Sequence, residues 1–223
     1  MAERVDAVAV IQGLGIDGAF ATEDKPVEFE MKQRSQGLTT LAVGLDKIAI
    51  LQYPHSALTT VATESLDAKV NNKTLTRLVL AVAADRSNRE CLGLSSNQIG
   101  DTHVRAFVLN AAALNKIDKQ QSKHTSFVNP VIREVFGTAS YLDESCMSFP
   151  ASTVVQVKRY PVVAVDFKDV DGNEQTERYS GLIAQAIQHE IDHLNGITLY
   201  QHASSKQQKK IRIHIEHART RRR

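Results

Sequence analysis

The feature that most constrains this chain is a helix that carries a pair of histidines. The stretch 181–194 repeats apolar residues at helical spacing, and Gly196 marks its end. His189 and His193 lie four residues apart on it, so both imidazoles can reach a single metal ion. Glu190 stands beside them, where a carboxylate can exchange a proton with a water molecule. The alternative is a solvated, charged helix face with two ordinary histidines.

Composition narrows the class of protein. The chain has 223 residues, which suggests one domain, and 42% of them are hydrophobic. No run of about 18 apolar residues is present, so we expect no membrane span. Two cysteines cannot make a disulfide scaffold and are typical of a reducing compartment. Glu3 and Asp6 do not suit an export signal, and the acidic stretch 17–30 does not suit a transit peptide. We therefore expect a cytoplasmic protein.

The order of the predicted elements favours an α+β domain. A first helix is expected over 71–86, capped by Asn71 or Asn72, and a third over 204–219. A glycine-bounded loop is expected at 91–100, and Asp171-Gly172 predicts a hairpin turn. The predicted strands are 5–11, 38–43, 104–110, 126–135, 154–157, 162–168 and 174–179.

Two histidines do not complete a catalytic metal site, which usually has three protein ligands and an open position. The candidates downstream of the helix lie in or near a basic tail that suits a metal poorly: His202, His214, Glu216 and His217. The upstream candidate is Cys146, whose thiolate would be a good ligand for a divalent metal. Taken alone, Cys146 is better explained as a small buried apolar residue than as a ligand.

Three segments in order resemble the motifs of peptide deformylases. They are Gly-Leu-Ser-Ser-Asn-Gln-Ile-Gly at 93–100, Glu-Ser-Cys-Met-Ser at 144–148 and Gln-His-Glu-Ile-Asp-His at 188–193. The family pattern is Gly-x-Gly-Leu-Ala-Ala-x-Gln, then Glu-Gly-Cys-Leu-Ser, then Gln-His-Glu-x-Asp-His. The resemblance covers roughly 48–202. It implies antiparallel strands packed around a central metal-binding helix.

The resemblance also implies a role for each motif residue. Cys146, His189 and His193 would bind the metal and leave a fourth position for water. Glu190 would take a proton from this water and pass it to the departing amine. Gln98 and the backbone N–H of Met147 would stabilise charge on the formyl oxygen. Gly93 is expected to contact the substrate.

The resemblance further implies the reaction and the cofactor. The chain would remove the N-formyl group from the N-terminal formyl-methionine of nascent polypeptides and release formate. The metal would be Fe(II), with Zn(II), Ni(II) or Co(II) also able to occupy the site.

Some positions depart from the family pattern. Cys91 stands where the family has its first glycine, Ser95 and Ser96 replace two alanines, and Ser145 replaces a glycine. Buried serine hydroxyls would need hydrogen-bond partners. A further hypothesis concerns Asp192, whose position between the two histidines favours a structural pairing with Arg159.

The C-terminal residues 206–223 hold eight basic residues and one glutamate, a net charge of +7. Since the whole chain has +2, the rest carries −5. Such a tail can bind polyanions, so the ribosome or rRNA is a candidate partner, and a solubilising, frayed helix is the alternative. No membrane partner is expected, and a monomer is the default expectation.

The expected organisation is an N-terminal extension (1–45), a catalytic domain (46–203) and the basic tail (204–223). Two alternatives to a deformylase remain at this point. One is a catalytically degenerate deformylase that binds the ribosome or another polyanion. The other is a zincin-like metallopeptidase, which would not need Cys146 or Gln98.

Overall fold

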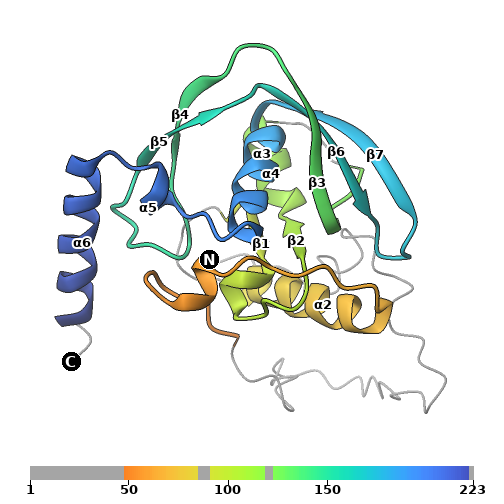
Figure 1. Ribbon diagram of the computed structural model, residues 1–223, viewed down its shortest axis with the longest axis horizontal. Coiled ribbons are helices and arrows are strands. Elements are labelled where there is room, and N and C mark those ends of the chain that lie inside the picture. The colour runs from red at the N-terminus through yellow and green to blue at the C-terminus, as the bar shows by residue number, and fades with distance from the viewer. Residues whose placement is uncertain (1–47, 85–90, 119–122, 221–223) are drawn as a thin grey trace, which may run out of the picture.

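Helix α4 (Gly181–Leu194) lies at the centre of the protein, with strands arching over it and helix α2 running beneath (Figure 1). The computed structural model describes residues 48–84, 91–118 and 123–220. The expected strands 5–11 and 38–43 fall outside these ranges. Within the described residues, no helix has the length and apolar character needed to cross a membrane.

Two antiparallel sheets surround α4. The larger has the order β1-β2-β3-β6-β7, and the smaller pairs β4 with β5. The larger sheet consists of β1 (Gly93–Ser95), β2 (Ala106–Leu109), β3 (Ser126–Phe136), β6 (Val162–Lys168) and β7 (Glu174–Ser180). The smaller consists of β4 (Ser140–Glu144) and β5 (Val155–Arg159). This arrangement confirms the predicted α+β class.

The main core forms where α4 meets the larger sheet. Val163, Val165 and Phe167 alternate along β6, so their side chains share one buried face. Ile183 and Ile187 of α4 belong to the same apolar cluster. The helix is thereby fixed on the side opposite its histidines.

The remaining helices are short or peripheral. They are η1 (Ser56–Thr59), α2 (Ala68–Ala84), η2 (Ser96–Ile99), α3 (Ala111–Asp118), α5 (Leu199–His202) and α6 (Ser205–Thr220). Helix α6 stands at the edge of the molecule (Figure 1). It is attached through Ile211 and Ile215, which join a third cluster with Phe149, Val155 and Leu199.

Several predictions of local structure are confirmed. Helices α4 and α6 match their predicted ranges closely, and the hairpin around Asp171-Gly172 joins β6 to β7. Gly172 has φ +84° and Gly196 has φ +71°, the left-handed conformation that glycine adopts without strain.

Other predictions were wrong. Helix α2 begins at Ala68, and its cap is the Asp67 carboxylate, which accepts from the backbone N–H of Lys69 at 2.8 Å. Asn71 lies inside the helix instead, where it is buried. The expected loop 91–100 contains β1 and η2, because its serines and Gln98 satisfy the backbone locally. Helix α3 and strand β4 were not predicted.

Candidate active site

Helix α4 supplies three polar side chains to one buried location. His193 and Glu190 are buried, and the side chain of His189 is 14% exposed. Their spacing on one helix places the two imidazole rings 5.0 Å apart. The sequence prediction that both histidines share a face is therefore confirmed by the geometry.

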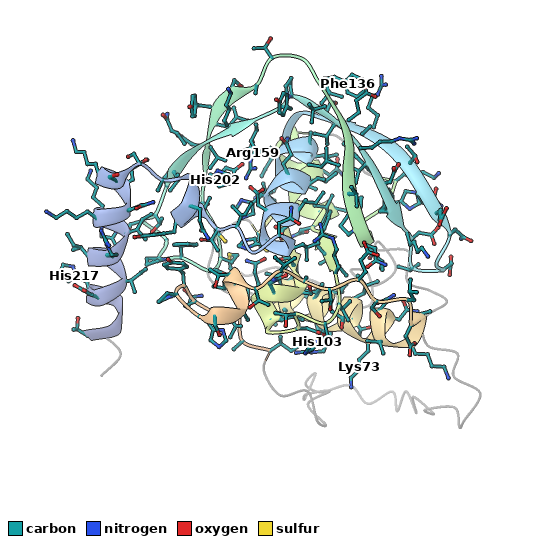
Figure 2. The ribbon with its side chains drawn as sticks, in the orientation of Figure 1. Lys73, His103, Phe136, Arg159, His202 and His217 are labelled. Atoms are coloured by element: carbon teal, nitrogen blue, oxygen red, sulfur yellow. The ribbon has the colours of Figure 1, made fainter. Side chains whose placement is uncertain are left out.

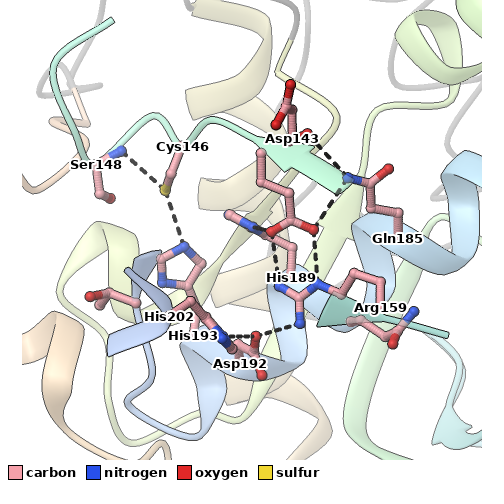
Figure 3. A network of polar contacts seen from close by, with 12 residues as sticks. Asp143, Cys146, Ser148, Arg159, Gln185, His189, Asp192, His193 and His202 are labelled. Atoms are coloured by element: carbon pink, nitrogen blue, oxygen red, sulfur yellow. Dashed lines mark hydrogen bonds and ion pairs between the residues drawn. The ribbon is translucent and has the colours of Figure 1, made fainter. Parts of the chain in front are cut away.

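Cys146 joins the histidines from the segment that follows β4. Its Sγ lies 3.2 Å from His193 Nε2, and it accepts from the backbone N–H of Ser148 at 3.4 Å (Figure 3). Ligand atoms of Cys146, His189 and His193 all lie within 4.8 Å of one another. One thiol and two imidazoles at this separation form a donor set that suits a divalent transition metal.

Electrostatics favour the thiolate form of Cys146. Burial on its own would raise the pKa of this thiol. The charge of His193, together with hydrogen bonds from both histidines, outweighs burial and holds the pKa of Cys146 well below its ordinary value. A deprotonated thiol is the form that binds metal.

A buried ion-pair network orients His189. Its Nδ1 lies 2.9 Å from Glu144 Oε2, and Arg159 donates to both oxygens of the same carboxylate, at 2.8 and 2.9 Å. Arg159 Nη1 also donates to Asp192 at 2.6 Å, and His202 Nε2 lies 2.8 Å from that carboxylate (Figure 3). Because Nδ1 is engaged, Nε2 of His189 is left to face Cys146 and His193.

The same network explains the pKa values of its acids. Burial would raise the pKa of Glu144, but hydrogen bonds from Arg159 and His189 lower it to about 2. Burial also acts against ionisation of Asp192, and His202 and Arg159 lower its pKa nonetheless. Both carboxylates are therefore charged at neutral pH. The hypothesis that Asp192 pairs with Arg159 is confirmed.

Glu190 has different surroundings. Its side chain is buried, and burial raises its pKa to about 7. Among the residues that the structure describes, none is a hydrogen-bond partner of its Oε2. A carboxyl group with this pKa can both accept and return a proton near neutral pH. Gly93 lies against it, since a Cβ on Gly93 would come within 2.8 Å of Glu190 Oε1.

Gln98 approaches the thiol from η2. Its Oε1 accepts from the backbone N–H of Ser95 at 2.9 Å and from Ser95 Oγ at 3.0 Å. Its Nε2 donates to Ser148 Oγ at 3.1 Å and lies 3.6 Å from Cys146 Sγ. The amide N–H₂ is therefore directed away from Ser95, toward the Cys146 thiol.

A cavity of about 640 Å³ opens onto these groups. Gly93, Gln98, Cys146, His189 and Glu190 lie along it, as does Met147. The lining also includes the apolar side chains of Leu92, Ile117, Ala151, Val154, Leu182 and Ala186 and the polar ones of Asp143, Glu144, Ser145 and Gln185. All but one of the site residues predicted from sequence line this cavity, and the exception, His193, contacts Cys146 from behind it.

Two of the departures from the family pattern are buried serines, and the hydroxyl groups of both make hydrogen bonds. Ser95 bonds Gln98, and Ser96 Oγ donates to the Val104 carbonyl. Ser145 is exposed, so its side chain has room beside Cys146. Cys91 is buried and its Sγ lies 3.2 Å from the Gly93 carbonyl oxygen.

The sequence patterns did not predict that Glu144 and His202 support the site. His202, considered above as a poor ligand, contacts Asp192 and does not belong to the Cys146 group. A signal for the network was available in β5, where Val155, Val157 and Arg159 alternate on the buried face. An arginine at an inward position of a strand requires buried hydrogen-bond acceptors, of which carboxylates are the strongest.

Comparisons with known proteins agree with this geometry. Residues 47–209 match the family model described as polypeptide deformylase. The chain is 33% identical over 181 residues to a peptide deformylase of Wolbachia pipientis wMel, covering 76% of this chain and 98% of the relative. It is 32% identical over 171 residues to one from Neisseria meningitidis serogroup C, covering 75% and 93%.

Solved structures show the same fold. A peptide deformylase from Ehrlichia chaffeensis superposes with a TM-score of 0.66 at 25% identity, covering 78% of this chain and 98% of that one. One from Plasmodium falciparum superposes with a TM-score of 0.62 at 27% identity, covering 75% and 93%. The motifs, the fold and the relatives together show that the chain belongs to the polypeptide deformylase family.

Proposed function

We propose that this chain hydrolyses the formyl amide of N-formylmethionyl nascent polypeptides and releases formate. The observation that carries the proposal is the grouping of Cys146, His189 and His193, with ligand atoms within 4.8 Å, beside Glu190 in one cavity. Membership of an enzyme family named for this reaction supports it. Neither the geometry nor the relatives favour a degenerate deformylase or a zincin-like peptidase.

The donor set fits a divalent metal. Cys146, His189 and His193 would hold it, with Fe(II) the first choice and Zn(II), Ni(II) or Co(II) as substitutes. The lowered pKa of the Cys146 thiol and the orientation of His189 by Glu144 both support this assignment. When bound, such a metal supplies a Lewis acid and lowers the pKa of a coordinated water.

Glu190 is the proposed general base and acid. Its Oε2 has no partner within the described part of the protein and is available to accept the proton of the attacking water. The same oxygen would then return the proton to the departing amine nitrogen. A general acid–base group at such a position contributes roughly 10²–10⁴-fold to the rate.

Gln98 and Met147 are the proposed donors to the formyl oxygen. Nε2 of Gln98 faces the Cys146 side of the cavity, and the backbone N–H of Met147 directly follows the thiol in sequence. Fixed donors act on the negative charge that develops in the transition state. The apolar lining at Ile117, Val154 and Leu182 is proposed to receive the methionine side chain.

Formate release from formyl-Met-Ala-Ser tests the proposal. The protein is loaded with Fe(II) or Ni(II) without oxygen, and we expect release by the wild type and a loss of about 10²–10⁴-fold in Glu190→Ala. Glu216→Ala, an exposed glutamate on α6, is the matched control and should retain full activity. Absence of formate from folded, metal-loaded wild type would contradict the proposal.

The metal assignment has its own measurement. Cys146→Ala should lose bound metal in elemental analysis, whereas Cys91→Ala should keep it. Metal retained in full by Cys146→Ala would instead fit a site that does not use the thiol.

The basic C-terminal helix is proposed to bind an anionic partner, the ribosome or rRNA. Lys206, Lys209, Lys210 and Arg212 of α6 are exposed, while Ile211 and Ile215 attach the helix to the body. A dense set of lysines on an exposed face attracts phosphates. A cytoplasmic location and a monomeric state stay predictions of the sequence.

A further inference from the structure

A fully buried hydroxyl group lies directly behind the amide proposed to act on the substrate. Ser95 is 0% exposed and ends β1, and Gln98 lies three residues later in η2. Two donors of Ser95 converge on one atom: the backbone N–H at 2.9 Å and Oγ at 3.0 Å from Gln98 Oε1.

These two hydrogen bonds determine which end of the amide faces the cavity. The backbone N–H of Ser95 can only donate, so the carbonyl end of Gln98 must point toward it. The N–H₂ end is then directed at Ser148 Oγ, 3.1 Å away, and at Cys146 Sγ. The second donor, Oγ, adds a restraint on rotation of the amide that the backbone N–H alone does not supply.

We propose that Ser95 is a positioning residue for Gln98. Its hydroxyl holds the Gln98 amide in the orientation in which Nε2 can donate to the formyl oxygen as charge develops there. The inference rests on the proposed role of Gln98, and Ser95 itself is not expected to touch the substrate. Without the hydroxyl, only the backbone N–H of Ser95 holds the Gln98 amide. Nε2 then spends a smaller fraction of the time in position to donate.

Ser96 provides a matched control. It is the next residue, it is also 0% exposed, and its Oγ donates to the Val104 carbonyl and not to Gln98. Serine to alanine at either position removes one buried hydroxyl from the same segment. Only the change at Ser95 removes a hydrogen bond to the amide. Since the family pattern has alanine at both positions, both variants are expected to fold.

The test measures kcat and KM for formate release from formyl-Met-Ala-Ser in Ser95→Ala, Ser96→Ala, Gln98→Ala and the double variant Ser95→Ala/Gln98→Ala. Loss of an oxyanion donor in Gln98→Ala should lower kcat by about 10²–10³-fold. Loss of one neutral hydrogen bond in Ser95→Ala should lower kcat by roughly fivefold to tenfold with KM within about twofold. Ser96→Ala should match the wild type.

The double variant separates positioning from a general structural effect. If Ser95 acts through Gln98, removing its hydroxyl in the Gln98→Ala background should leave kcat unchanged. Metal content and melting temperature are recorded for every variant. An unchanged kcat in Ser95→Ala, an equal loss in Ser96→Ala, or the same relative loss in the Gln98→Ala background would each overturn the proposal.

The outcomes also distinguish a failure of the role of Ser95 from a failure of the role of Gln98 or of the proposed deformylase function. Full activity in Gln98→Ala would remove the proposed role of Gln98, and with it that of Ser95, while leaving the deformylase assignment in place. Absence of formate release by the wild type would contradict the proposed function itself.

Discussion

Helices α4 and α6 are similar in length, but their charged side chains have different surroundings. Helix α4 is enclosed by both sheets, and its acidic residue Asp192 is paired with Arg159 and His202. Helix α6 touches the body through Ile211 and Ile215 and presents lysines to solvent. In Figure 2, side chains fill the space around α4, whereas those of α6 project outward at the edge of the molecule.

The difference in charge burial gives the two helices different roles. Charge is costly to bury, so α4 can carry it only with fixed partners, and those partners also orient the metal-binding side chains. Charge on α6 stays hydrated and is available to a partner. Substitutions near α4 should therefore change stability and chemistry together, and substitutions on the exposed face of α6 should change binding alone.

The largest effect on stability is expected at Arg159. Replacing it with methionine leaves the buried Glu144 and the partly buried Asp192 without their shared cation, which should cost about 3–5 kcal/mol in urea unfolding. Lys158→Met, the exposed neighbour on β5, serves as the control and should change stability by less than about 0.5 kcal/mol. Equal losses in the two variants would show that the network does not stabilise the fold.

A second prediction concerns pH. The folded pKa of Glu144, about 2, lies below the value of about 4.3 usual for an exposed glutamate. Its stabilising contribution is therefore complete above about pH 5 and is lost as pH falls through 4 toward 2. Urea unfolding of chelator-treated protein should show this loss, up to about 3 kcal/mol.

Glu144→Gln isolates that contribution. The variant should be less stable at pH 7 and should decline less steeply between pH 5 and pH 2, by up to about 1.4 kcal/mol per pH unit. Parallel curves for the two proteins would contradict the assignment of the shift to Glu144.

A smaller effect is expected where α6 is attached. Ile211→Ala removes a buried side chain from one side of the helix and should cost about 1–2 kcal/mol, less than in an enclosed core. Ile213→Ala, on the exposed side of the same helix, should cost almost nothing. Limited proteolysis should cut α6 sooner in the first variant than in the second.

The smallest effect on the chemistry is expected from the α6 lysines. Replacing Lys206, Lys209 and Lys210 with glutamine should leave formate release from a tripeptide unchanged and weaken binding to ribosomes. The dependence of log affinity on log salt should become shallower, by about 0.7–0.9 for each replaced lysine that had neutralised a phosphate. The control replaces Lys69 and Lys73, exposed on α2, with glutamine. Unchanged ribosome binding after the α6 substitutions would reject this partner.

Sequence patterns predicted the elements that have strong apolar periodicity or a clear termination signal. Helix α4 has both, with apolar residues on one face and Gly196 after its end. Strand β4 has neither, because it is an edge strand with Tyr141 67% exposed and only Leu142 partly buried among its apolar residues. Its pairing with β5 depends on contacts distant in sequence, which a local pattern does not contain.

The site shows the same division. Motif spacing was sufficient to predict that His189 and His193 share a helical face with Glu190 nearby. It did not predict that Glu144 fixes His189, because that contact joins residues 45 positions apart. The sequence likewise did not identify the hydrogen-bond partner of the Ser95 hydroxyl, because it indicates only that a buried hydroxyl needs a partner.

The close approach of Gly93 to Glu190 has a consequence for protein engineering. Any β-carbon at position 93 would press on the carboxylate of Glu190, at 2.8 Å from Oε1 and 3.0 Å from Cγ. Substitutions at positions 93 and 190 are therefore coupled. A mutant library that randomises one of them while holding the other fixed would sample mostly displaced carboxylates, whereas a library that varies both can search for new pairs.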